Sequence, residues 1–255
     1  MVQRLLTGSR LAPRSLMVTE TALEDLRPAL AAHPDIPVYV VRQPVMNELA
    51  GFNIHRGCLA LGERPVSRDW RDLARDARRL VILERIGDPD NVGSAFRTAA
   101  AFGVDAVLLD PASTDPLYRK AIRTSMGATL AVPFSRIAGR AGPLLSAEAR
   151  SAKADGPGEW PRALSELGRD GVAVVALTPS SSAQCLRTVA AELAGRRVAL
   201  VLGHEGDGLS QGALDACAFR ARIPMAPGAE SINVAAASAI AMYELSGTWR
   251  VQRGE

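Results

Sequence analysis

Long apolar runs are missing from this 255-residue sequence. No apolar segment approaches the roughly 20 residues that a membrane helix needs. The first residues also lack the apolar stretch of about 7–15 residues that a signal peptide carries. These absences predict an intracellular, cytoplasmic protein that does not interact with a membrane.

Cysteine and lysine are also scarce. The three cysteines (Cys58, Cys185 and Cys217) lie far apart without a CxxC pair, which argues against a disulfide scaffold or a zinc module, and we expect no metal site. Only two of the 30 basic residues are lysines. Arginine suits phosphate recognition, although an arginine-rich genome is at least as good an explanation. With a net charge of +3 and no polybasic tail, charge alone favours nucleic-acid binding only weakly.

Short apolar runs alternate with helix-like stretches along most of the chain. Runs of four to six apolar residues are typical of strands buried on both faces. The expected strands are 15–19, 38–41, 58–61, 80–83, 106–109, 172–177, 198–202 and 220–223. The expected helices include 94–102, 160–167, 211–216 and 233–245. This alternation predicts an α/β fold with a mostly parallel sheet.

A charged stretch with few bulky apolar residues divides the chain near residue 65. We expect a linker at 65–78, with room for a short amphipathic helix. It separates a small α/β domain at 1–64 from a larger domain at 79–255. Residues 139–158 are rich in Gly, Ala, Ser and Pro, and we expect them to form a surface excursion.

The first segment that could form a functional site runs from Asp88 to Arg97 and follows the expected strand 80–83. Asp90 or Asn91 can cap a helix that starts near residue 92. Gly93 would leave room for a ligand on the first turn, on the face where Arg97 projects. A helix N-terminus with an arginine can bind a phosphate. An ordinary capped helix with one exposed arginine is the alternative, and physics alone slightly favours it.

The second segment is a loop with three glycines and Glu205, which directly follows the expected strand 198–202. Such loops let the backbone approach a cofactor. The spacing G-x-x-G-x-G is not the dinucleotide fingerprint, and no G-K-[ST] is present for a phosphate-binding P-loop. The sequence 208–212 matches the hydrolase pattern G-x-S-x-G, but no histidine follows Ser210 to act as the base.

The third segment, residues 222–237, leaves a strand at Ile223 and enters an alanine-rich helix. Ser231 and Asn233 are both good N-cap residues for that helix. From the residues alone, a capped core helix explains this segment as well as a binding site does.

In this order and spacing, the three segments resemble one family. The patterns N-x-G-x-x-x-R (motif one), L-G-x-E-G-x-G-x-S (motif two) and I-P-M-x-P-G-x-x-S-x-N-V-A (motif three) are similar to those of the SpoU/TrmH branch of the SPOUT RNA methyltransferases. The resemblance covers residues 80–245. Residues 14–62 resemble, more loosely, the substrate-binding domain that often precedes this catalytic unit.

The resemblance implies a C-terminal trefoil-knotted methyltransferase domain preceded by a small α/β RNA-binding domain. Relatives begin that small domain with an additional strand and a longer helix, so we expect an N-terminally truncated version here. The implied reaction transfers a methyl group from S-adenosylmethionine to a ribose 2′-hydroxyl of structured RNA, with rRNA favoured over tRNA. Family members are homodimers with the site near the dimer interface.

The resemblance also assigns residues. Arg97 is the principal catalytic residue, and because a guanidinium is a poor base we favour a positioning role over proton acceptance. The full implied catalytic set is Asn91, Arg97, Glu205, Ser231 and Asn233, in which Asn91 and Glu205 orient Arg97 and the loop. The implied cofactor-binding residues are Thr178, Leu202, Gly203, Gly208, Ile223, Met225, Ser231 and Ile232. The candidate RNA-binding residues are Arg97, Arg10, Arg14, Arg42 and Arg56.

Several alternatives stay open at the level of sequence. The same fold could serve as a non-catalytic RNA-binding or ribosome-assembly factor, although the intact polar set argues against it. Methylation of a base is a third possibility, which motif one disfavours. His204 stands where relatives often carry a small residue, and we favour a solvent-facing side chain over a substrate contact. Neither the RNA, nor the nucleotide, nor a resistance or housekeeping role follows from these motifs.

Overall fold

A computed structural model describes residues 1–137, 159–229 and 231–250, the last four of them without their side chains. The surface excursion expected at 139–158 lies outside the described residues. The chain divides into two compact units, Met1–Val66 and Ser67–Glu255.

The first unit is a small mixed sheet with helices. Its elements are α1 (Val2–Thr7), β1 (Pro13–Val18), α2 (Glu20–Leu30), β2 (Val38–Val40), α3 (Gln43–Ala50) and β3 (Cys58–Gly62). Strand β1 lies between the other two, parallel to β2 and antiparallel to β3. Every second residue of β1 points to the core, so Leu16 and Val18 are buried with Ala22 and Leu26 of α2.

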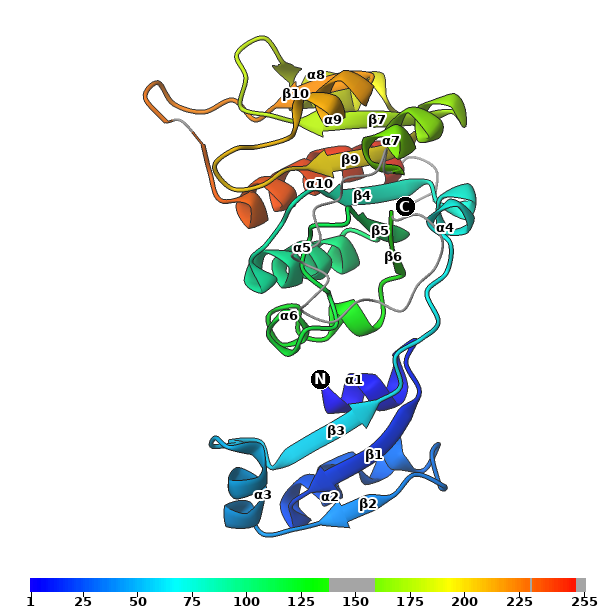
Figure 1. The fold of residues 1–255 in the computed structure, drawn as a ribbon, viewed down its shortest axis with the longest axis vertical. Coiled ribbons are helices and arrows are strands. Elements are labelled where there is room, and N and C mark those ends of the chain that lie inside the picture. The colour runs from blue at the N-terminus through cyan, green and yellow to red at the C-terminus, as the bar shows by residue number, and fades with distance from the viewer. Residues whose placement is uncertain (138–158, 230, 251–255) are drawn as a thin grey trace. The chain divides into compact units, whose positions relative to one another are not determined.

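The second unit contains a seven-stranded sheet in which every pairing is parallel (Figure 1). The strand order is β6-β5-β4-β9-β7-β10-β8. The strands are β4 (Arg79–Leu83), β5 (Ala106–Leu109), β6 (Phe134–Arg136), β7 (Val172–Leu177), β8 (Gln184–Cys185), β9 (Arg197–Leu202) and β10 (Phe219–Arg222). The predicted α/β fold with a mostly parallel sheet is confirmed. The knot stays a prediction.

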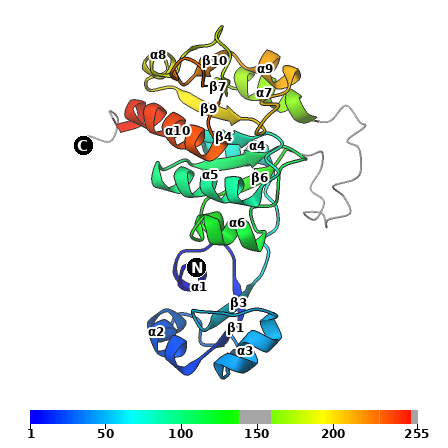
Figure 2. The same cartoon turned by 90° about the vertical axis from the view of Figure 1, so that its left-hand side faces the viewer.

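Helices cover both faces of this sheet, as Figure 2 shows for α5 and α10 on one side and α7 and α9 on the other. One face carries α5 (Pro89–Ala101), α8 (Leu186–Glu192) and α10 (Val234–Arg250), and the other carries α4 (Trp70–Asp76), α7 (Glu159–Arg169) and α9 (Gln211–Ala216). Helix α6 (Arg119–Thr124) and the 3-10 turn η1 (Ala128–Leu130) pack on α5.

The two covered faces explain why the central strands read as continuous apolar runs. Successive strand side chains point to opposite faces. Val81 and Leu83 of β4 therefore enter one core, and Leu80 and Ile82 enter the other. Complete burial of such a side chain contributes about 1.5–3 kcal/mol. The expected strands 106–109 and 172–177 coincide with β5 and β7, whereas the short strands β6 and β8 at the two sheet edges were not predicted.

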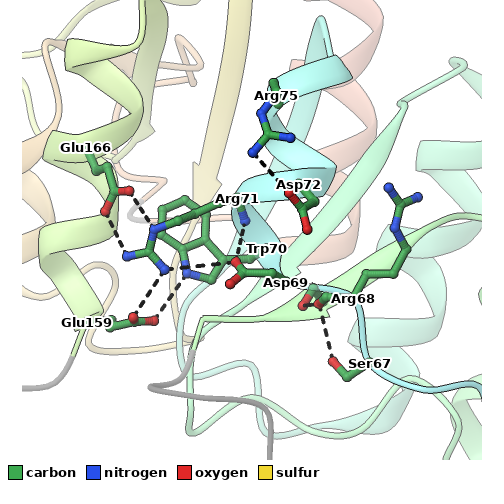
Figure 3. A network of polar contacts seen from close by, with 10 residues as sticks. Ser67, Arg68, Asp69, Trp70, Arg71, Asp72, Arg75, Glu159 and Glu166 are labelled. Carbon is green, nitrogen blue, oxygen red and sulfur yellow. Dashed lines mark hydrogen bonds and ion pairs between the residues drawn. The ribbon is translucent and has the colours of Figure 1, made fainter.

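Helix α4 lies within the stretch that the sequence marks as a linker. Trp70 is only 3% exposed and packs in the core of the second unit. Arg71 extends from α4 to α7, where its Nε lies 2.6 Å from Glu166 Oε1 and its Nη1 lies 3.2 Å from Glu159 Oε1 (Figure 3). Its guanidinium also stacks 4.4 Å from the centre of the Trp70 ring. These charge-assisted bonds fasten α4 to α7.

None of the helices in the described ranges is long and apolar enough to cross a membrane.

Candidate cofactor and active site

A cavity of about 280 Å³ opens where three neighbouring strands, β7, β9 and β10, end. Parallel strands bring their carboxyl ends to one sheet edge, and ligands of open α/β sheets bind there. Lining residues from the loops after β7 and β9 are Leu177, Thr178, Pro179, Leu202, Gly203, His204, Glu205, Gly206 and Gly208. Those after β10 are Ile223, Met225, Ser231, Ile232, Asn233, Val234 and Ala237.

The cavity gathers every residue that the sequence assigned to the cofactor. These are Thr178, Leu202, Gly203, Gly208, Ile223, Met225, Ser231 and Ile232. What the cavity binds stays a prediction. The exposed His204 lines it as well, so its side chain meets solvent at the edge of the cavity.

The motif-two loop, residues 203–210, folds back on itself at the end of β9. His204 and Gly208 form an antiparallel bridge, in which the Gly208 amide donates to the His204 carbonyl at 3.1 Å. A Cβ on Gly203 would lie only 2.5 Å from the backbone of Gly208 and Leu209, so no other residue fits there. Gly206 and Gly208 adopt φ values of +103° and +68°, which favour glycine.

The three motifs meet at the side chain of Asn233. Its Nδ2 donates to Glu205 Oε1 at 2.6 Å and to Asn91 Oδ1 at 3.3 Å. Its Oδ1 accepts the Ala235 amide at 2.8 Å and thereby caps α10. The predicted capping role of Asn233 is confirmed. Motif three is therefore joined directly to motifs one and two at the mouth of the cavity.

Arg97 makes no hydrogen bond or ion pair with this cluster. It is exposed on α5, and no hydrogen bond or ion pair joins its side chain to any residue that the structure describes. The expected hydrogen bonds from Asn91 and Glu205 to Arg97 are not formed in this structure, because both side chains pair with Asn233 instead. The expected orientation of the loop by these two residues stays a prediction. The guanidinium of Arg97 remains available to an external anion.

The start of α5 also differs from the prediction. The helix begins at Pro89 and is capped by Asp88, which accepts the Asp90 amide at 2.9 Å, so neither Asp90 nor Asn91 is the cap. Proline at the first helical position moves the helix start upstream because its fixed φ suits the first turn.

Gly93 serves helix packing rather than ligand access. A Cβ there would lie 2.7 Å from the Ala121 carbonyl oxygen and 2.8 Å from Thr124 Cβ, both on α6. The missing side chain therefore lets α6 approach α5 closely, which corrects the expected opening for a ligand.

Asp90 strengthens the same contact between α5 and α6. Its carboxylate accepts a hydrogen bond from the Thr124 hydroxyl at 2.7 Å and pairs with Lys120 Nζ at 2.9 Å. The bond from Thr124, followed by that from Lys120, lowers the pKa of Asp90 below its ordinary value. Asp90 is therefore ionised at neutral pH and holds the first turn of α5 against α6.

The candidate RNA-binding arginines of the first unit, Arg10, Arg14, Arg42 and Arg56, are all exposed. Arg14 pairs with Glu63 at 3.1 Å, and both side chains are more than half exposed. Solvent screens such a pair strongly, so it would yield readily to a phosphate.

Sequence reasoning missed Glu84, which directly follows β4. Its side chain is 1% exposed and accepts hydrogen bonds from Trp160 Nε1 at 2.8 Å and from the Ser210 hydroxyl at 2.6 Å. The sequence signal for it was an acidic residue directly after an apolar strand. A carboxylate in that place is buried with its neighbours and therefore requires hydrogen-bond donors.

Comparisons with known proteins identify relatives of this chain. The sequence profile of the SpoU rRNA methylase family matches residues 78–143 and 145–243. An uncharacterized tRNA/rRNA methyltransferase of Mycobacterium bovis is 37% identical over 95% of this chain and 77% of its own length.

Two further relatives carry more specific descriptions. The 23S rRNA (guanosine(2553)-2′-O)-methyltransferase RlmP of Bacillus subtilis is 29% identical over 67% of this chain and 59% of its own. The crystal structure of an AdoMet-bound rRNA methyltransferase from Sinorhizobium meliloti superposes with a TM-score of 0.72 at 24% identity, covering 95% of this chain and 82% of that one. The family profile spans most of the chain, and the resemblance inferred from the three motifs is confirmed: the protein belongs to the SpoU rRNA methylase family.

Proposed function

We propose that the protein transfers a methyl group from S-adenosylmethionine to a ribose 2′-hydroxyl of structured RNA, with rRNA as the favoured substrate. The observation that carries the proposal is the joining of all three motifs at Asn233, beside a cavity lined by motifs two and three. Family membership supports RNA methylation, and the name of the Bacillus relative supports the ribose position.

The cavity suits S-adenosylmethionine in size and chemistry. Its volume of about 280 Å³ is close to the lower end of the range for small-molecule sites, roughly 300–1,000 Å³. Apolar walls from Leu177, Leu202 and Ile223 suit the adenine ring, and the glycine turns bring backbone groups close. Glu205 lines the cavity and would supply a carboxylate to the positively charged sulfonium. The eight cofactor candidates from the sequence would hold the molecule, which supplies an electrophilic methyl group.

The protein contributes alignment and charge to this displacement. Methyl transfer requires the attacking oxygen in line with the methyl group and a route for its proton. Arg97 is free to bind the phosphate beside the target ribose and to hold the hydroxyl. Asn91 and Glu205 fix Asn233 and thereby motif three. Ser231 lines the cavity in the same segment and would contact the cofactor or the ribose.

The two parts of the chain take different roles in this proposal. Residues 67–255, which include α4 from the expected linker, form the methyltransferase domain. Residues 1–66 form an RNA-binding domain that uses Arg10, Arg14, Arg42 and Arg56. The catalytic unit forms a homodimer in the cytoplasm, and α10 offers the exposed apolar side chains Ile240 and Tyr243 for the contact. Sedimentation equilibrium at micromolar concentration tests the dimer, and a monomer would exclude it.

The deciding experiment measures transfer of labelled methyl groups from S-adenosylmethionine to total rRNA and tRNA from cells that lack the gene. We expect label at a single 2′-O position, with none when Arg97→Ala is used. Label on a base would overturn the ribose assignment. Tight RNA binding without label and without cofactor binding would favour the RNA-binding or ribosome-assembly alternative.

A further inference from the structure

Two consecutive residues after β4, Glu84 and Arg85, hold the motif-two loop at its end and at its turn. Strand β4 pairs with β9 in register, and the Glu84 amide donates to the Leu202 carbonyl at 2.9 Å. The side chains of Glu84 and Arg85 therefore start beside the point where the loop leaves β9. We call these two residues the β4 clamp.

Glu84 fixes the end of the loop. Its carboxylate accepts the Ser210 amide at 2.9 Å and the Ser210 hydroxyl at 2.6 Å. Ser210 Oγ accepts the Ala213 amide at 3.2 Å and so caps α9. A buried carboxylate is tolerated only when donors satisfy it, and Trp160 Nε1 supplies a further one at 2.8 Å. Glu84 thereby fastens the last residue of the loop to the end of β4.

Arg85 fixes the turn of the loop. Its Nη2 donates to the Gly208 carbonyl at 3.1 Å, and its Nη1 lies 3.7 Å from the Asp207 carboxylate. The Arg85 backbone adopts a φ of +54°, a conformation that side chains rarely take. Its Nε is buried and lacks a hydrogen-bond partner among the described residues. Both features are unfavourable, and they persist only where the surroundings impose them.

The loop needs such external support because of its own composition. Three of its first six residues are glycine, and glycine loses the most conformational freedom on ordering. The same loop contributes Gly203, Glu205 and Gly208 to the cavity. Its shape thus determines the cavity, while its backbone alone would not hold that shape.

We propose that Glu84 and Arg85 are positioning residues that set the motif-two loop in its cofactor-binding conformation before the cofactor arrives. A loop ordered in advance loses less entropy on binding, so affinity rises without any direct contact from the clamp. This role rests on the proposed binding of S-adenosylmethionine in the cavity.

Two substitutions of Arg85 separate positioning from overall stability. Arg85→Ala removes the guanidinium and keeps the strained φ, whereas Arg85→Gly removes the guanidinium and also the strain. We expect both to weaken binding of S-adenosylhomocysteine by about tenfold or more, as measured by titration calorimetry. Arg85→Gly should nevertheless have a higher thermal midpoint than Arg85→Ala, because it lacks the backbone strain. Equal affinity in the wild type and both variants, or affinity that follows the thermal midpoint, would overturn the proposal.

Matched controls lie elsewhere in the same unit. Met126 has a φ of +52°, and Met126→Gly relieves the same kind of strain away from the loop. Asp105 accepts the Arg78 and Arg79 amides at 3.0 and 2.9 Å at the opposite end of β4. We expect Glu84→Gln to weaken binding, while Asp105→Asn and Met126→Gly leave the dissociation constant within about twofold.

Amide hydrogen exchange distinguishes failure of the clamp from failure of the proposed function. Without any ligand, Arg85→Gly should speed exchange at residues 203–209 at least tenfold relative to Met126→Gly. If Arg85→Gly exchanges faster but the wild-type protein binds no S-adenosylhomocysteine, the proposed function is overturned and the result confirms only that the clamp orders the loop. Unchanged exchange would exclude the clamp whatever the cofactor.

Discussion

The side-chain amide of Asn233 lies 3.3 Å from the side-chain oxygen of Asn91, although 142 residues separate them. The same amide donates to Glu205 at 2.6 Å, so one nitrogen joins three segments that are distant in sequence. The side-chain oxygen of Asn233 caps α10 by accepting the Ala235 amide. Asn233 therefore combines a structural duty with a place at the candidate active site, and substitutions can separate the two.

Replacing Asn233 in two ways distinguishes the cap from the cluster. Asn233→Ala removes the helix cap and also the bonds to Asn91 and Glu205. Loss of an N-cap costs about 1 kcal/mol, or roughly 2–4 °C in thermal midpoint for a unit of this size. Asn233→Asp keeps an acceptor for the Ala235 amide but places a carboxylate against Glu205. We expect methyl transfer to fall at least tenfold in both variants, with the larger loss of thermal midpoint in Asn233→Ala. An active Asn233→Asp enzyme would exclude the cluster from catalysis.

Arg97 is expected to matter for transfer and for nothing else. Because it is exposed and makes no hydrogen bond or ion pair with a described residue, Arg97→Ala should leave the thermal midpoint and cofactor affinity unchanged while abolishing methyl transfer. Arg162→Ala, an exposed arginine on α7, is the matched control and should remain active. Single-turnover assays measure methyl transfer, scanning calorimetry measures the thermal midpoint, and titration calorimetry measures the cofactor affinity. Comparable losses in both variants would indicate a general charge effect instead.

Two helix glycines should respond in opposite directions to alanine. At Gly93 the added Cβ meets the backbone of α6 at 2.7 Å, so Gly93→Ala should destabilise by about 1–3 kcal/mol. At Gly168 in α7 nothing lies within 4 Å, so Gly168→Ala should stabilise by about 0.5–1 kcal/mol. Urea unfolding followed by circular dichroism measures both. A neutral Gly93→Ala would show that α6 can move away from α5 at little cost.

Cys217 should stay unreactive until the protein unfolds. Burial, assisted by the nearby charge of Glu84, raises the pKa of its thiol to about 12. Folding therefore favours the neutral thiol. The contribution of the raised pKa to the free energy of unfolding is complete below the ordinary thiol pKa and is lost as the pH rises from there toward 12. Alkylation at pH 8 with peptide mapping should modify Cys217 only in urea. Glu84→Gln should lower its pKa, because the negative charge is removed. Rapid modification of native Cys217 would contradict its burial.

Much of the fold could be predicted because local pattern and tertiary role agree in the central strands. The apolar runs at 106–109 and 172–177 became β5 and β7 with unchanged bounds, since strands buried on both faces must be apolar throughout. The edge strands β6 and β8 were missed because they are two or three residues long and carry polar side chains. The start of α5 was misplaced because Asp88, Asp90 and Asn91 are all capable caps, and only the folded backbone selects among them.

The sequence by itself determined the family, the α/β class and the segments that surround the cavity, because glycines, caps and apolar runs act locally and leave a readable pattern. Only the tertiary structure decided which polar groups meet. Asn91 and Glu205 pair with Asn233 rather than Arg97, Gly93 accommodates α6, and Glu84 reaches Ser210, 126 residues later. These contacts depend on which strands become neighbours in the sheet, and the order β4-β9-β7-β10 does not follow from residue spacing.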